Sequence, residues 1–152
     1  MPEIPEKLAD TLDALSLVPD RAERIQLLID TAERFQEVPP EVAARPFPED
    51  HRVPACESEA FVWAQRRPDG RLDFHFAVEN PQGISAKAMA VILKDTLSGQ
   101  PLEQVAAVPQ DIVYKVFGNE LSMGKSMGLM GMVGMVTTLA KRAQGDFTPQ
   151  ST

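Results

Sequence analysis

The strongest constraint on the fold is a two-residue period on both sides of the sequence RPDGR. Before it, Phe61 and Trp63 alternate with small residues, and after it apolar residues alternate with mostly polar ones over 71–78. This period is typical of β-strands, and Asp69-Gly70 is typical of a two-residue hairpin turn. The sequence therefore predicts a β-hairpin whose aromatic side chains share one face. The expected cross-strand pairs are Trp63 with Phe76, Phe61 with Val78, and Arg66 with Asp73.

Helical periods lie on either side of this hairpin. The predicted helices span residues 6–17, 21–37, 86–98 and 122–143, with a short one beginning at 109–111. Asp20 and Ser85 are the expected N-caps of the second and third helices. A hairpin alone is marginally stable, so it needs helices on its apolar face or a short third strand at His51–Val53. We therefore expect an α+β fold, with a small antiparallel sheet (hairpin plus short third strand) packed against helices.

The length of 152 residues fits a single domain, which we expect over residues 1–145 with a disordered tail at 146–152. The net charge of −7 and the lack of a basic stripe argue against nucleic-acid binding. No run of eighteen apolar residues predicts a membrane span, and the first residues do not resemble a signal peptide. A single cysteine excludes an internal disulfide and favours a reducing, cytoplasmic location.

Two glycine-containing motifs resemble nucleotide-binding sequences but lack their spacing. In VFGNELSMGKSMG, Gly118 lies one residue too far from Gly124 for a phosphate-binding loop. Gly128, Gly131 and Gly134 recur every three residues within a predicted helix, so they are not a dinucleotide fingerprint. They indicate instead a smooth helix surface that allows close approach of another segment. The methionines among them are typical of core packing or of an adaptable partner surface.

The histidines, His51 and His75, show no metal-ligand spacing with the single cysteine, so no metal site is predicted. His75 is expected on the polar face of the hairpin as a solvated residue. His51 is closer in sequence to the cysteine, but a cysteine hydrolase would also need a third orienting group and an oxyanion site. A thiol enzyme that turns over without a partner is therefore disfavoured.

Cys56 follows a connection that holds five prolines between residues 38 and 54, and polar residues follow it directly. Composition alone leaves open whether it is a small buried apolar residue or a reactive thiol. A reactive thiol needs nearby positive charge or N–H donors to form the thiolate. The candidates for that role are His51, Arg52 and Lys125.

The segment VPACESEAFVW at 53–63 resembles the pattern V-x-G-C-x-S-x-V-W of the SufE family, sulfur-acceptor proteins of iron–sulfur cluster assembly. Two weaker similarities follow in the same order, VPQDIV at 108–113 and LSMGKSMGL at 121–129. The resemblance extends from about residue 8 to 143 and implies the family's α+β fold, which is similar to that of the IscU scaffold. This chain differs from the family at Ala55, where the family has glycine, at Glu57, often neutral there, and at Lys125, usually arginine.

The resemblance implies that Cys56 accepts persulfide sulfur from a SufS-like cysteine desulfurase, stimulates that enzyme and passes sulfur to an iron–sulfur scaffold. The pyridoxal phosphate belongs to the desulfurase, so no cofactor is expected on this chain, which acts as a covalent carrier rather than an enzyme. The residues expected to support Cys56 or to bind the partner are His51, Arg52, Pro54, Ala55, Glu57, Ser58 and Lys125. If the thiol is sheltered in the free protein, docking must expose it. The alternative is a binding module of the same fold that docks on a desulfurase or another partner without carrying sulfur.

Overall fold

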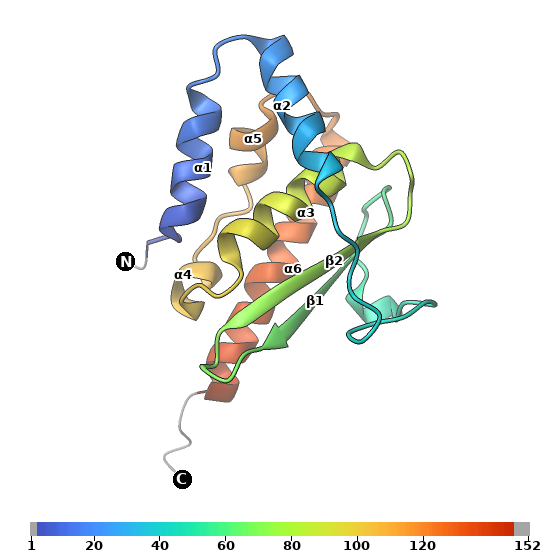
Figure 1. The fold of residues 1–152 in the computed structure, drawn as a ribbon, viewed down its shortest axis with the longest axis vertical. Coiled ribbons are helices and arrows are strands. Elements are labelled where there is room, and N and C mark those ends of the chain that lie inside the picture. The colour runs from blue at the N-terminus through green and yellow to red at the C-terminus, as the bar shows by residue number, and fades with distance from the viewer. Residues whose placement is uncertain (1–2, 148–152) are drawn as a thin grey trace.

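The computed structural model describes residues 3–147 of the chain. Its elements are α1 (Glu6–Ser16), α2 (Arg21–Glu33), the 3-10 turn η1 (Glu49–His51), β1 (Ala60–Arg66), β2 (Leu72–Val78), α3 (Ile84–Leu97), α4 (Leu102–Ala106), α5 (Ile112–Phe117) and α6 (Met123–Phe147). The two strands form one antiparallel sheet that crosses α3 and α6, while α1 and α4 lie to the left and α2 at the top of the view (Figure 1). The expected α+β architecture is confirmed. In the described part of the chain, no helix combines the length and the apolar character needed to cross a membrane.

The hairpin forms, but its predicted register is wrong by one residue. Trp63 lies opposite His75, and Phe61 lies opposite Ala77. The turn contains three residues rather than two, because the Arg67 N–H donates to the Arg71 carbonyl at 2.7 Å. A two-residue turn would have required Pro68 to donate in that place, and proline has no N–H. Its fixed φ instead suits the start of a turn that ends at Gly70, which has a φ of 87°.

This one-residue shift places the aromatic side chains on opposite faces of the sheet. Phe74 and Phe76 pack with the helices in the main core, whereas Phe61 and Trp63 face away from it. The outer face is covered by the connection between α2 and β1, and Phe47 packs edge-on against Trp63 with ring centroids 4.9 Å apart. The members of this second cluster are Val38, Val42, Ala43, Phe47, Phe61, Trp63 and Ala77. The long proline-rich connection therefore completes the sheet's hydrophobic cover.

His75 shares this outer face and is half-buried, not solvated as the sequence suggested. Its Nε2 lies 3.2 Å from the Gln65 Oε1, while its Nδ1 is buried without a partner among the described residues. Burial, and next the nearby charge of Lys94, hold the pKa of His75 below its ordinary value.

The expected third strand at His51–Val53 does not form. His51 belongs to the 3-10 turn η1, and only Arg52 makes an isolated antiparallel bridge, to Phe61. The chain turns at Pro54 and Ala55, and the φ of 57° at Ala55 ends the extended backbone directly after this bridge.

Several helix boundaries differ from the predicted ones. Helix α2 ends at Glu33, four residues early, because the chain turns so that the Val38 N–H can donate to the Phe76 carbonyl at 2.8 Å. Helix α3 begins at Ile84, so Ser85 lies inside its first turn and does not cap it. Helix α4 was not predicted. Helix α6 continues to Phe147, and the rest of the expected tail lies outside the described residues.

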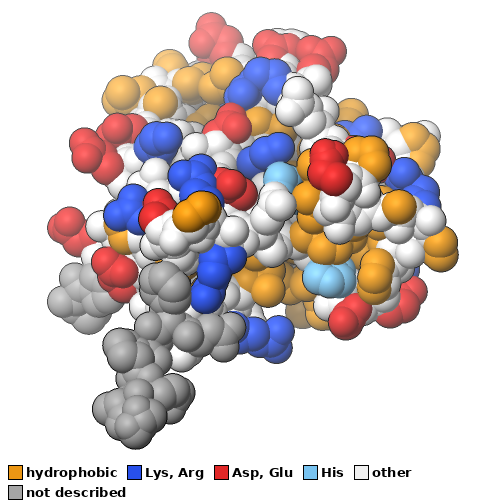
Figure 2. Space-filling model, turned by 60° about the horizontal axis from the view of Figure 1, so that its bottom comes forward, with side chains coloured by type: hydrophobic (Ala, Val, Ile, Leu, Met, Phe, Trp, Pro, Cys, Tyr) orange, Lys and Arg blue, Asp and Glu red, His pale blue; other side chains and the backbone are white. Residues whose placement is uncertain are grey.

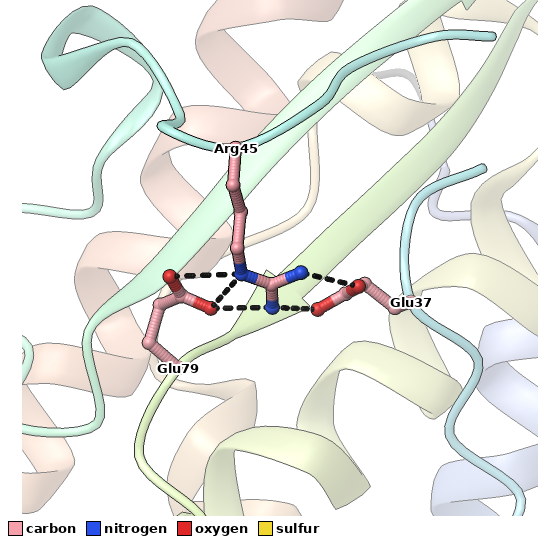
Figure 3. A network of polar contacts seen from close by, with 3 residues as sticks. All are labelled: Glu37, Arg45 and Glu79. Carbon is pink, nitrogen blue, oxygen red and sulfur yellow. Dashed lines mark hydrogen bonds and ion pairs between the residues drawn. The ribbon is translucent and has the colours of Figure 1, made fainter. Parts of the chain in front are cut away.

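One arginine ties the proline-rich connection to the end of β2. The Arg45 guanidinium donates to the carboxylates of Glu37 and Glu79, with Nη1 2.9 Å from the Glu37 Oε2 and Nη2 2.6 Å from the Glu79 Oε1 (Figure 3). These hydrogen bonds raise the pKa of Arg45 above its ordinary value. The network lies next to the segment that carries the chain from β2 to α3.

Candidate functional site

Cys56 lies in a short loop, Val53–Glu59, which we call the cysteine loop. Backbone hydrogen bonds fasten both of its ends: the Val53 N–H donates to the Ala60 carbonyl at 2.8 Å, and the Glu79 N–H donates to the Glu59 carbonyl at 3.1 Å. A further bond, from the Asn80 N–H to the Ser58 carbonyl, joins the loop to the β2–α3 connection at 3.1 Å. The loop is therefore anchored to the sheet at its base.

Two tight turns shape this loop around the thiol. Pro54 and Ala55 form the first turn, and Ala55 has a φ of 57°, the left-handed conformation that favours glycine. In the second turn the Glu59 N–H donates to the Cys56 carbonyl at 3.1 Å, and Glu59 also has a positive φ, of 53°. Cys56 lies between these left-handed residues, is half-buried and packs against the main core. Its thiol is thus partly covered rather than fully exposed or fully buried.

The inner side of the cysteine loop rests on glycines of α6. A Cβ atom added to Gly128 would lie 3.1 Å from the Cα atom of Cys56, and one added to Gly131 would lie 3.4 Å from the Pro54 carbonyl oxygen. One added to Gly124 would lie 3.7 Å from a carboxylate oxygen of Glu57. The close approach that the glycine spacing predicted is therefore present, and the cysteine loop is the segment that approaches.

The opposite side of the loop packs against the start of α3. A Cβ atom on Gly83 would lie 3.0 Å from the Ser58 Oγ and 2.8 Å from Val78. Glycine at this position thus allows the β2–α3 connection to close over Ser58. Sequence reasoning missed both Gly83 and Asn80, which no local motif marks.

The cationic candidates nearest in sequence do not direct their charge at the thiol. The Arg52 Nη2 donates to the Glu59 Oε1 at 3.2 Å, and its Nη1 lies 3.6 Å from the Glu49 carboxylate. Its guanidinium lies over the Phe61 ring, 5.8 Å from the centroid. Arg52 therefore braces the base of the loop by joining residues on both sides of it.

His51 is directed toward the outer face of the sheet. Its Nδ1 lies 2.9 Å from the Val62 carbonyl oxygen, which identifies Nδ1 as the donor in that bond. Its ring stacks on Trp63, with centroids 5.3 Å apart and planes inclined by 23°. This placement gives His51 a bracing role like that of Arg52.

Lys125 lies in the first turn of α6, where the Ser122 hydroxyl accepts a hydrogen bond from its backbone N–H at 3.2 Å. Its side chain lines a cavity of about 310 Å³ between α2, α3 and α6, together with Ile84 and Glu120. Cys56 does not line that cavity. The structure therefore brings Pro54, Ala55, Glu57 and Ser58 together around the thiol, and places Lys125 beside a separate cavity.

No group of three or more histidine, cysteine, aspartate or glutamate side chains lies close enough to hold a metal ion among residues 3–147. The chemical group that distinguishes the site is the thiol of Cys56. Among the described residues, the charges closest to it in sequence are the carboxylates of Glu57 and Glu59, and Glu59 is paired with Arg52.

Comparison with known proteins links this arrangement to one family. The family model described as "SufE: Fe-S metabolism associated domain" matches residues 9–140. A hypothetical protein from Thermus thermophilus, known from a solution structure, has a TM-score of 0.73 and 24% identity to this chain, over 93% of this chain and 98% of that one. At this identity the likeness shows a shared fold. No curated protein sequence matches the chain.

Proposed function

We propose that this chain, which belongs to the SufE family of Fe–S metabolism associated domains, is a sulfur carrier that works with a cysteine desulfurase. Cys56 receives sulfur from a persulfide on the desulfurase, and the chain then delivers that sulfur to an iron–sulfur scaffold. The pyridoxal phosphate of the reaction belongs to the desulfurase. Removal of sulfur from the desulfurase frees that enzyme for another turnover, which is how the carrier stimulates it.

The transfer requires no oxidant and no reductant. The Cys56 thiolate attacks the outer sulfur of the donor's persulfide, a new bond forms between that sulfur and the Cys56 Sγ, and the old sulfur–sulfur bond breaks. The donor cysteine leaves as a thiolate with the electron pair of the broken bond. The same exchange, with Cys56 now as the leaving thiolate, passes the sulfur to the acceptor.

The observation that carries this proposal is the position of the chain's single cysteine in an anchored but partly open loop. The half-buried environment of Cys56 shelters a bound sulfur from solvent, and both neighbours of the thiol, Ala55 and Glu57, are exposed. With no second cysteine in the chain, an internal disulfide cannot discharge the persulfide. The geometry thus suits a group that is loaded by one protein and unloaded by another.

The decisive experiment is mass spectrometry of this protein after incubation with a cysteine desulfurase and cysteine, without reductant. A gain of about 32 Da on the peptide that contains Cys56 is expected from the exchange chemistry. No gain, together with unchanged desulfurase turnover, would refute the carrier function.

A docking module that does not carry sulfur is the alternative, and the exposed side chains of Met123 and Met127 on α6 favour it, because methionine-rich surfaces adapt to partners. The variant Cys56→Ser separates the two functions. A carrier loses its stimulation of the desulfurase when the thiol is replaced, whereas a docking module keeps it.

A further inference from the structure

A groove with a volume of about 650 Å³ runs along α6 and ends beside the cysteine loop. Pro54 and Gly131 line one end, and the exposed side chains of Lys141 and Arg142 line the other. From Gly131 to Arg142 the helix rises by roughly 16 Å. The groove therefore runs from a positively charged end of α6 to Pro54 of the cysteine loop, and Cys56, which follows two residues later, does not itself line it.

The charge at the far end of the groove contrasts with the rest of the molecule, whose net charge is −7. Every other arginine of the described chain donates to a carboxylate or a backbone carbonyl, whereas Arg142 has no such partner among residues 3–145. Arg52 lines the same groove, but Glu49 and Glu59 already pair with it. The positive charge open to a ligand thus comes from Lys141 and Arg142, and Asp50 is the one residue with a carboxylate side chain among those that line the groove.

Lys141 and Arg142 lie just before the last turn of α6, which holds no basic residue, so interaction with the helix dipole is only a weak structural explanation for both side chains. That explanation does not account for the groove that they share with residues of the 50–54 segment and of β1. Seen from the end of the molecule where α6 terminates, Lys and Arg side chains lie mainly left of centre, interspersed with Asp and Glu, and a lobe rich in hydrophobic side chains lies to the right (Figure 2).

The middle of the groove suits an extended peptide. Its lining combines the apolar side chains of Val62, Met135 and Leu139 with the hydroxyl of Thr138 and the amide of Gln110. A strand rises by about 3.3 Å per residue, so about five residues span the groove.

We infer that this groove binds an extended acidic segment of a partner protein, with its carboxylates at Lys141 and Arg142 and the residues that follow directed toward Cys56. The identity of the partner as a sulfur donor or acceptor rests on the proposed function, whereas the binding itself does not. The groove then acts as a guide that brings a partner's cysteine close to the thiol.

The test uses the intact protein and a short synthetic peptide that begins with two glutamates and ends, after five neutral residues, in a cysteine activated as a mixed disulfide with thionitrobenzoate. The Cys56 thiolate attacks the peptide sulfur, the peptide becomes disulfide-linked to Cys56, and thionitrobenzoate leaves as a coloured thiolate. The measured quantity is the rate for this peptide divided by the rate for an analogue with two glutamines.

Binding in the groove and repulsion by the protein's net charge predict opposite rate ratios. The groove predicts a rate ratio above one, about fivefold, because two exposed ion pairs each contribute modestly. Net charge alone predicts a ratio below one, since a chain of −7 repels an acidic peptide. A ratio at or below one in the unaltered protein would overturn the inference.

Charge-reversal variants show where the preference arises. In the double variant Lys141→Glu/Arg142→Glu the ratio is expected to fall below one. The matched control Lys7→Glu/Lys115→Glu changes the net charge by the same amount at exposed positions of α1 and α5, and it should keep a ratio above one. An equal fall in both variants would refute the groove. Lys141→Gln/Arg142→Gln, which adds no negative charge, should bring the ratio close to one. It provides the same test if the charge-reversed variant does not fold.

Failure of this inference is distinguishable from failure of the proposed function. The peptide assay contains no desulfurase, so a ratio of one leaves the gain of sulfur on Cys56 intact. Conversely, a desulfurase that loads no sulfur on Cys56 leaves the peptide preference intact. Cys56→Ser, which releases no thionitrobenzoate from the peptide, confirms the reacting group in both assays.

Discussion

The contact between the cysteine loop and α6 makes a sharp prediction for the variant Gly128→Ala. Alanine is favoured over glycine in the interior of a helix by about 1 kcal/mol, so an unobstructed substitution would stabilise the protein. At this position the new methyl group would lie 3.1 Å from the Cα atom of Cys56 and 3.4 Å from the Ala55 carbonyl oxygen. Both of these are backbone atoms, which cannot rotate away as a flexible side chain can.

The expected magnitude follows from that distance. Carbon atoms pack best at about 3.5–4.0 Å, so the loop has to retreat by roughly 0.5 Å. The loop resists, because hydrogen bonds at Val53, Ser58 and Glu59 fasten it to the sheet and to the β2–α3 connection. Overpacking typically costs about 1–3 kcal/mol. With the helix preference subtracted, the free energy of unfolding should fall by about 1 kcal/mol, which lowers Tm by about 2–4 °C for a chain of this size.

The assay combines urea denaturation with the rate of alkylation of Cys56 by iodoacetamide. If the strain is concentrated in the loop, the conformation that covers the Cys56 thiol loses about 1 kcal/mol relative to one that exposes it. Alkylation then accelerates about fivefold. Gly145→Ala is the matched control, because it lies in the same helix and its added Cβ atom would meet no atom within 4 Å. That variant should leave the alkylation rate unchanged and should not destabilise the protein.

A second variant tests whether the effect depends on the distance between the added methyl group and the cysteine loop. Gly124→Ala would place its methyl group 3.7 Å from the Glu57 carboxylate, an ordinary contact distance, so it should resemble Gly145→Ala rather than Gly128→Ala. The reasoning is refuted if Gly128→Ala stabilises the protein as much as the control and leaves the alkylation rate of Cys56 unchanged.

Three further substitutions test other parts of the structure. Ala55→Gly should raise the free energy of unfolding by up to about 1 kcal/mol in urea denaturation, because the relief of left-handed strain exceeds the added freedom of the unfolded chain. A lower free energy of unfolding would contradict the φ of 57° at Ala55. The pKa of His75 is lowered in the folded state, so the unfolded state binds more protons below about pH 6.5 and stability falls as pH decreases through that range. In denaturation at pH 7.5 and 5.5, His75→Gln should lose less stability than the unaltered protein, and an equal loss would contradict the shift. Arg45→Ala removes the hydrogen bonds to Glu37 and Glu79 and should speed amide hydrogen exchange in residues 38–48 while the exchange of α6 stays unchanged; unchanged exchange in both segments would show that the network does not hold the connection.

The sequence predicted the kinds of elements well because their signals are local. The hairpin, the α+β architecture and most helices follow from periodicity, and the main error follows from one residue. A two-residue turn at Asp69-Gly70 would put Pro68 at a donor position of the ladder, and its missing N–H requires a longer turn. The resulting shift changed which aromatic side chains enter the main core, so the long connection between α2 and β1 became the cover of the second face.

The surroundings of Cys56 were less predictable because they come from distant parts of the chain. The spacing of Gly128 and Gly131 indicated a close approach, but nothing in the sequence identified the cysteine loop as the approaching segment. Likewise, the charge of Arg52 suggested help for the thiol, whereas its position between Glu49 and Glu59 gives it a bracing role. Side chains that are paired in the fold cannot be recognised as paired from composition.

The anchoring of the cysteine loop bears on how a sheltered thiol could reach a partner. The base of the loop is held by the hydrogen bonds of Val53 and Glu59 to the sheet, so movement of the whole loop would break several bonds at once. The tip makes fewer such bonds, and left-handed residues, Ala55 and Glu59, lie on either side of Cys56. Because Glu59 also belongs to the anchored base, local strain of this kind favours rearrangement at Ala55 over movement at the base. We therefore expect that docking exposes Cys56 by rotating the tip of the loop away from Gly128, while the hairpin and α6 stay unchanged. If amide exchange became faster by the same factor at Val53 and at Cys56 when the partner binds, this expectation would be contradicted.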